Sequence, residues 1–108
     1  MKKSTTKRNG HRLRQFLGDK TYDKAVSLAT CMIISNSYAY CKLMKFVDEQ
    51  HPSNEHQAAY FVDTVTCLVA LSDDEIERFA RKNANSHGYV RMCKLARAIR
   101  TILNSEEE

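Results

Sequence analysis

Basic side chains dominate the sequence from residue 78 to residue 103, and their type and spacing point to a binding role. This stretch holds seven Lys or Arg residues and no Asp or Glu, a net charge of +7. Apolar periodicity predicts two helices here, at about 73–82 and 89–103, joined by a polar turn. This order is typical of helix-turn-helix DNA-binding proteins, in which small residues let the two helices cross closely. The small residues and apolar anchors are Ala80, Ala84, Val90 and Cys93.

The same segment supplies a candidate binding set for nucleic acid or for another acidic partner. Residues near the start of the second helix would face base edges, and basic residues further along would lie beside phosphates. The first group is His87, Tyr89 and Arg91. The second group is Lys94, Arg97 and Arg100. Basic residues at the end of the preceding helix and near the N-terminus extend the set: Arg81, Lys82, Arg12 and Arg14.

Two features favour a simpler interpretation, an αα-hairpin whose charged residues form a solvated face. Asn83 and Asn85 stand where a helix-turn-helix expects apolar residues. Steps of three residues rotate by about 300° each on a helix, so the four basic residues of the last helix spread around its axis. The sequence alone leaves both interpretations open.

Patterns that bind metals or perform catalysis are missing from the sequence. Residue types of a zinc site occur, but their spacings fit none of the compact pairings of structural zinc sites. A Gly-rich phosphate loop, a nucleophile elbow and an H-E-x-x-H pair are all absent. We therefore expect no metal, no cofactor and no enzymatic activity. The residues considered for zinc are Cys41, His51, His56 and Cys67.

The elements that position these residues are predicted to be helices throughout. The 108 residues include only three Gly and one Pro, whereas a fold of many short strands needs turn residues about every ten positions. A chain of this length forms one core. The predicted fold class is all-α, a compact bundle of five or six short-to-medium helices around a central buried helix at about 55–71.

Local signals place the helix boundaries. A short helix is predicted at 11–17, capped by Asn9 and ended by Gly18. The longest helical signal runs from 19 to about 50, and Ser35-Asn36-Ser37 makes a kink or a break as plausible as a continuous rod. Ser72 and Glu75 form a capping box, which starts the helix at about 73–82.

The sequence also leads to expectations about the exposure of three groups of side chains. Asp63 is expected to lie on a narrow solvent face with Ala59 and Thr66. The four cysteines are expected to be small, buried hydrophobic residues: Cys31, Cys41, Cys67 and Cys93. Six aromatic or Met side chains either pack in the core, the simpler account, or leave a surplus that contacts a partner or a second copy. They are Met32, Tyr38, Tyr40, Met44, Tyr60 and Phe61.

Charge is divided into blocks along the chain, which has a net charge of +4. Residues 1–20 carry +6, residues 21–77 carry −6 and residues 104–108 carry −3. We predict a flexible basic arm at 1–9, a single helical domain at 10–104 and an acidic tail at 105–108. No stretch is apolar enough for a signal peptide or a membrane span, and the unpaired cysteine pattern suits a reducing compartment, so a cytoplasmic location is expected.

These observations predict a binding protein. The first hypothesis is a small non-catalytic regulatory or inhibitory protein that docks on nucleic-acid machinery or a protein partner through charged faces. Short chains without motifs often come from viruses or mobile elements, which weakly favours this hypothesis. One alternative is a helix-turn-helix DNA-binding regulator that uses helices at about 73–82 and 89–103. Another is a homo-oligomeric assembly subunit, in which the acidic middle of one copy pairs with the basic end of the next.

Overall fold

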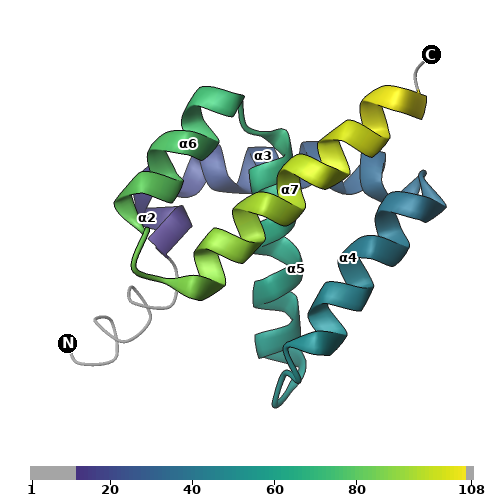
Figure 1. Cartoon of the computed structure of the whole chain (residues 1–108), viewed down its shortest axis with the longest axis horizontal. Helices are drawn as coiled ribbons and strands as arrows, with labels where there is room; N and C mark the ends of the chain where they lie inside the picture. Colours follow the sequence, from purple (N-terminus) through teal and green to yellow (C-terminus); the bar gives the residue numbers. More distant parts are fainter. Residues whose placement is uncertain (1–11, 107–108) are drawn as a thin grey trace.

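The computed structural model describes residues 12–106, and the regular elements in that range are all helices. The predicted all-α bundle of five or six helices is therefore confirmed (Figure 1). The predicted basic arm at 1–9, the Asn9 cap and the last two residues of the acidic tail lie outside the described range. In chain order the helices are α2 (Arg12–Leu17), α3 (Asp19–Ile34), α4 (Ser37–Glu49), α5 (Glu55–Ala70), α6 (Asp73–Lys82) and α7 (His87–Glu106).

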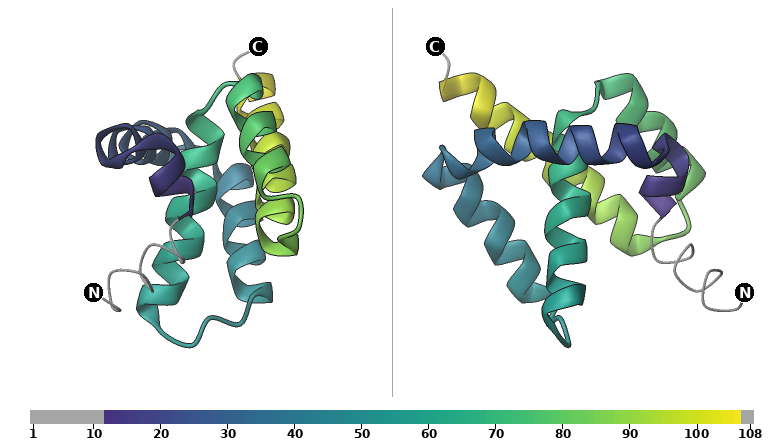
Figure 2. Two further views of the ribbon diagram at one scale, coloured as in Figure 1. Left: turned by 90° about the vertical axis from the view of Figure 1, so that its left-hand side faces the viewer. Right: turned by 180° about the vertical axis from the view of Figure 1, so that it is seen from behind.

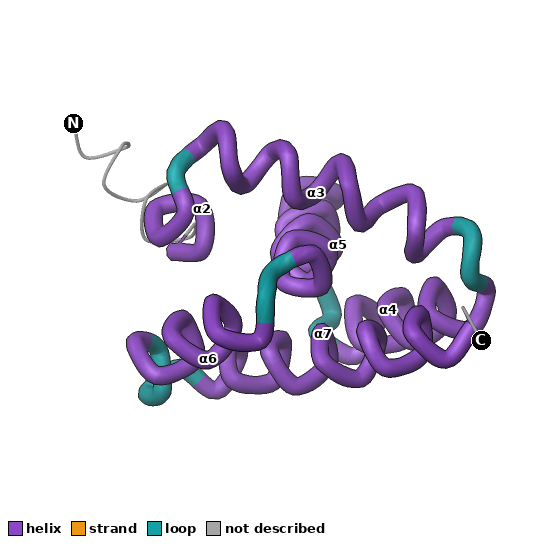
Figure 3. The backbone as a smooth tube through the Cα atoms, turned by 90° about the horizontal axis from the view of Figure 1, so that it is seen from above, coloured by secondary structure: helices purple, strands orange, loops and turns teal. Residues whose placement is uncertain are grey.

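Helix α5 forms the centre of the molecule, as the sequence predicted. It crosses between α3 on one side and α7 on the other, and it also packs against α4 (Figures 2 and 3). Six consecutive residues, Thr64 to Val69, are buried because α5 has neighbours on every side at this level. The Thr64 hydroxyl donates to the Tyr60 carbonyl at 2.7 Å, so its burial leaves no unsatisfied polar group.

The long helical signal from 19 to 50 breaks into α3 and α4. Asn36 leaves the helical conformation at φ −119°, ψ 104°, and its side chain accepts a hydrogen bond from the Ala39 N–H at 3.0 Å. This is an N-cap, which satisfies one of the free donors at the start of α4. Ser35 closes α3 by donating from its hydroxyl to the Cys31 carbonyl at 2.8 Å. The chain therefore reverses direction here, and we call this junction the elbow (Figure 3).

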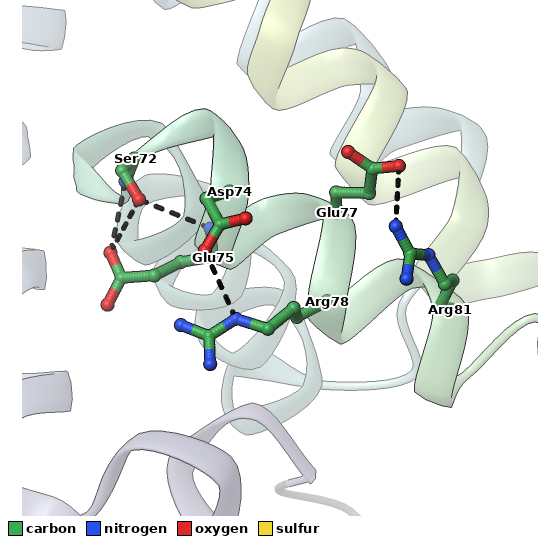
Figure 4. Close-up of polar contacts among 6 residues, drawn as sticks. All are labelled: Ser72, Asp74, Glu75, Glu77, Arg78 and Arg81. Atoms are coloured by element: carbon green, nitrogen blue, oxygen red, sulfur yellow. Dashed lines mark hydrogen bonds and ion pairs between the residues drawn. The ribbon is translucent and has the colours of Figure 1, made fainter.

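Helix α6 begins at the predicted capping box, shown in Figure 4. The Ser72 hydroxyl accepts from the Glu75 N–H at 3.2 Å, and a Glu75 carboxylate oxygen accepts from the Ser72 N–H at 3.1 Å. The two residues thus satisfy each other's backbone donors. Further along α6, pairs spaced four residues apart join Asp74 to Arg78 and Glu77 to Arg81.

Helices α6 and α7 form an antiparallel hairpin. Arg100 Nη1 lies 2.6 Å from Asp73 Oδ1, which joins the first residue of α6 to a late turn of α7. If the helices crossed at a right angle, the two backbone positions would stand about 25 Å apart at a rise of 1.5 Å per residue, too far for these side chains to meet. The pair therefore has the αα-hairpin arrangement and lacks the steep crossing of a helix-turn-helix.

Helix α7 is longer than the predicted 89–103. It starts at His87, because the Ser86 hydroxyl accepts a hydrogen bond from the Tyr89 N–H at 3.3 Å and acts as a cap for the first turn. It continues to Glu106, into the segment predicted as the acidic tail. Within residues 12–106, no helix combines the length and the apolar character needed to cross a membrane.

Candidate functional site

The basic residues of α6 and α7 are largely paired with acidic residues of the same chain. Besides the two pairs within α6 and the Arg100–Asp73 pair, Arg91 Nη2 lies 3.9 Å from Glu49 Oε1 of α4. The +7 block of residues 78–103 therefore folds against the −6 block that precedes it. The pairing of acidic middle with basic end that the assembly hypothesis placed between copies occurs within one chain.

The basic residues of α7 also point in different directions, as the three-residue spacing indicated. Arg91 faces α4, where its guanidinium lies 5.7 Å from the Phe46 ring centroid. Arg97 and Arg100 lie beside α6, in a pocket lined by Asp73 and Glu77. Lys94 and His87 are exposed. The predicted set does not form one uniform basic face.

Tyr89 corrects the predicted binding set, because its side chain is 7% exposed and cannot reach base edges. Its hydroxyl contacts the Tyr60 hydroxyl of α5 and accepts a hydrogen bond from the Arg12 N–H at 3.3 Å. Its ring packs edge to face on Phe79, and Phe79 packs on Phe16 in the same way. These contacts join α2, α5, α6 and α7. We call this cluster the aromatic end: Phe16, Tyr60, Phe79 and Tyr89.

The two N-terminal basic residues of the predicted set separate. Arg14 turns to α3, where it pairs with Asp19 at 3.2 Å and Asp23 at 3.4 Å. Arg12 turns to the end of α6 and lines a pocket with Lys82. One member of the N-terminal basic cluster thus meets one member of the C-terminal cluster at the aromatic end.

The elbow has the opposite surface character. In the described part of the chain, the exposed large hydrophobic side chains all come from residues 28–40: Leu28, Met32, Ile34, Tyr38 and Tyr40. For Met32, Tyr38 and Tyr40, the sequence left open whether the side chains pack in the core or remain on the surface, and here they remain on the surface. The other three candidates pack against the core: Met44, Tyr60 and Phe61. The sequence signal that marks the elbow is the absence of charge from Ala25 to Cys41.

Two shallow pockets lie on either side of the last turns of α7 at the elbow. One, of about 260 Å³, is lined by Tyr38, Cys41, Lys42, Lys45 and Ile102. The other, of about 190 Å³, includes Leu28, Met32 and Leu103 in its lining. Ile102 and Leu103 lie in the same turn of α7, so this turn borders both pockets, and we treat their apolar lining together as one candidate surface. We call it the elbow surface: Leu28, Met32, Tyr38, Ile102 and Leu103.

Three expectations about exposure change. Thr66 is buried, so the narrow solvent face predicted for Asp63 does not form. Asp63 is half-buried, and its pKa is raised by desolvation, opposed by the charge of Arg14 and reinforced by that of Asp23. Cys67 and Cys93 are buried as predicted, whereas Cys31 and Cys41 are exposed at the elbow.

The described residues do not form a metal centre. Among residues 12–106, no three His, Cys, Asp or Glu side chains gather closely enough to hold an ion. The residues considered for zinc also differ in exposure: Cys67 is buried in α5, whereas Cys41, His51 and His56 are exposed.

Comparison of the chain with protein-family models, with curated proteins and with solved structures found no match. The functional conclusion therefore rests on the surfaces described above.

Proposed function

We propose that the protein is a non-catalytic regulatory binding module that docks on a protein partner through the elbow surface. The observation that carries the proposal is the uncharged, apolar exposure confined to residues 28–40 in a chain with 28% charged residues. A small domain stays in solution by covering its surface with charge, and a contiguous apolar area marks a contact site. Tyr and Met are also enriched where partners bind.

The charge around the elbow surface indicates the chemistry of the partner. Lys42 and Lys45 line the Tyr38 pocket, and no acidic side chain lines either elbow pocket among the described residues. Neither lysine forms an ion pair within the described part of the chain. An amphipathic helix with one apolar face and flanking carboxylates would bury its apolar residues on Tyr38 and Ile102 and pair with the lysines.

The internal charge pairing supports a protein partner over nucleic acid. The arginines that the helix-turn-helix alternative assigned to DNA already face carboxylates: Arg81, Arg91 and Arg100. Phosphate contacts would have to displace these acids, and the like charges left nearby would repel the nucleic acid.

The free thiols agree with the expected cytoplasmic location.

Selection from a displayed library of random helical peptides tests the proposal. The full chain is the bait, and the Tyr38→Glu variant removes peptides that bind elsewhere. We expect selected peptides to combine spaced apolar residues with Asp or Glu. Lys45→Glu should weaken their binding by about tenfold or more, whereas Lys20→Glu, an exposed lysine at the far end of α3, should leave it unchanged.

Three outcomes would overturn the proposal. The selected peptides could bind the Tyr38→Glu variant as tightly as the unaltered chain. Sedimentation could show a mass that doubles with concentration and reverts in that variant, which would make the occupant a second copy. Salt-sensitive binding of random DNA or RNA that needs Arg91 and Lys94 would instead restore the nucleic-acid hypothesis.

A further inference from the structure

A pocket at the aromatic end, opposite the elbow, has the composition of a small-molecule anion site. It has a volume of about 350 Å³, within the range of small-ligand sites. Neither Asp nor Glu is among the described residues that line it. The lining residues are Arg12, Gln15, Phe16, Phe79, Lys82 and Asn83.

Both cations of this pocket are positioned by uncharged groups. Arg12 Nη1 donates to Asn83 Oδ1 at 3.2 Å, and its guanidinium lies 5.7 Å from the Tyr89 ring centroid. Lys82 Nζ lies 5.8 Å from the Phe16 ring centroid. Aromatic faces attract cations without neutralising them. Unlike the arginines that pair with acids, these two side chains have no carboxylate partner among residues 12–106.

Asn83 fixes the direction of Arg12. Its side-chain Nδ2 donates to the Phe79 carbonyl at 3.0 Å, and the residue is 8% exposed. The amide therefore presents its oxygen to Arg12 and holds one edge of the guanidinium, while the remaining donors are available to a ligand. Arg geometry suits the paired oxygens of a phosphate.

We propose that this pocket binds a phosphate monoester carried by a small planar molecule, with the phosphate between Arg12 and Lys82. The planar group packs on Phe16, whose ring is only partly buried. The phosphate supplies the negative charge that the pocket lacks, and the aromatic ring supplies a stacking surface. This inference does not depend on the elbow surface, so each can fail while the other holds.

NMR titration of the full chain with adenosine monophosphate, adenosine and inorganic phosphate tests the inference. We expect millimolar or tighter binding of the nucleotide, with shifts at the Asn83 side chain, and binding of adenosine about tenfold weaker. Lys82→Glu should abolish the shifts at Asn83. Lys94→Glu, which makes the same charge change on exposed α7, should retain them.

The inference is wrong if the nucleotide produces no shift at Asn83, or the same shift in the Lys82→Glu chain. It is also wrong if adenosine binds as tightly as the nucleotide, because the phosphate would then contribute nothing. The phosphate monoester could belong to a free nucleotide or to the 5′ end of a nucleic-acid strand. A dinucleotide with a 5′-phosphate, with its 5′-hydroxyl form as the control, is therefore titrated beside the mononucleotide. Preference for the dinucleotide would assign the site to a strand end, and preference for the mononucleotide would assign it to a free ligand.

Discussion

At the aromatic end, the rings of Phe16, Phe79 and Tyr89 pack edge to face and Phe79 is fully buried, whereas at the elbow Tyr38 is 72% exposed. The helices that form the elbow bury their inner faces up to the junction itself, where Ile33 and Ala39 are fully or almost fully buried. The difference shows that aromatic residues stabilise the fold at one end and are available for contacts at the other. The proposed docking surface therefore predicts that stability and binding can be altered separately in this chain.

The largest expected effect separates the two ends by stability. Phe79→Ala removes a fully buried ring with two aromatic neighbours, and we expect a loss of about 3–5 kcal/mol in the free energy of unfolding. Tyr38→Ala should change that free energy by less than about 0.5 kcal/mol, since the side chain is mostly in solvent. Urea denaturation measures both. Equal losses would mean that the elbow is part of the core.

The next effect concerns pH. Burial raises the pKa of Tyr22 to about 12, partly opposed by its hydrogen bond with Thr64. The hydroxyl is neutral when protonated, so between about pH 10 and pH 12 the unfolded chain loses this proton and the folded chain keeps it. Stability should therefore fall as pH rises through that window, by up to about 1.4 kcal/mol for each unit of the difference.

The matching variants for this pH effect are Tyr22→Phe and Tyr38→Phe. The difference between the denaturation midpoints at pH 8 and pH 11 should be smaller in Tyr22→Phe than in the unaltered chain, because one buried hydroxyl is gone while Tyr60 and Cys67, whose pKa values burial also raises, remain. Tyr38→Phe should keep the full decrease, since it alters only the exposed end. If Tyr22→Phe loses as much stability as the unaltered chain, the alkaline sensitivity comes from other groups.

A smaller effect compares two serines at helix starts. Ser72 is the N-cap of α6 in a complete capping box, whereas Ser37 follows the cap of α4 and is exposed at the elbow. Ser72→Ala should cost about 1 kcal/mol in thermal or urea unfolding. Ser37→Ala should cost less than about 0.5 kcal/mol, and the reverse order would show that Ser37 closes the elbow.

The smallest effect is expected from the exposed charge pairs. Arg81 and Glu77 are spaced four residues apart on α6, and both side chains are more than half exposed. Arg81→Ala should cost about 0.3–0.5 kcal/mol, less at high salt. Urea midpoints measured in low and high salt give this loss, and a larger one would mean that the pair stabilises α6 more than an exposed pair normally does.

Much of the fold follows from local patterns. The apolar run of α5 and the capping box at Ser72 depend on neighbours within a few residues, so the sequence predicts them well. The break at Asn36 was left open because residues that favour caps and turns are found both at helix breaks and at kinks of continuous helices. The break lets α3 and α4 pack separately against α5.

The candidate sites were harder to predict, because they depend on contacts between distant segments. Tyr89 is buried by Tyr60 and Phe79, and the pairing of Arg91 with Glu49 joins residues far apart in the chain. Charge blocks in a sequence do not show which charges will neutralise each other. The uncharged stretch at 25–41 was visible, but only the structure shows which of its apolar residues face outward.

The most direct test compares binding of one selected acidic helical peptide to two charge variants, one at each end. Lys45→Glu alters the elbow surface and Lys82→Glu alters the aromatic end, and each replaces one exposed lysine. Docking at the elbow predicts that fluorescence anisotropy shows binding weakened by about tenfold or more in the first variant and unchanged in the second. Loss in the Lys82→Glu chain, with full binding by the Lys45→Glu chain, would contradict the proposed docking surface.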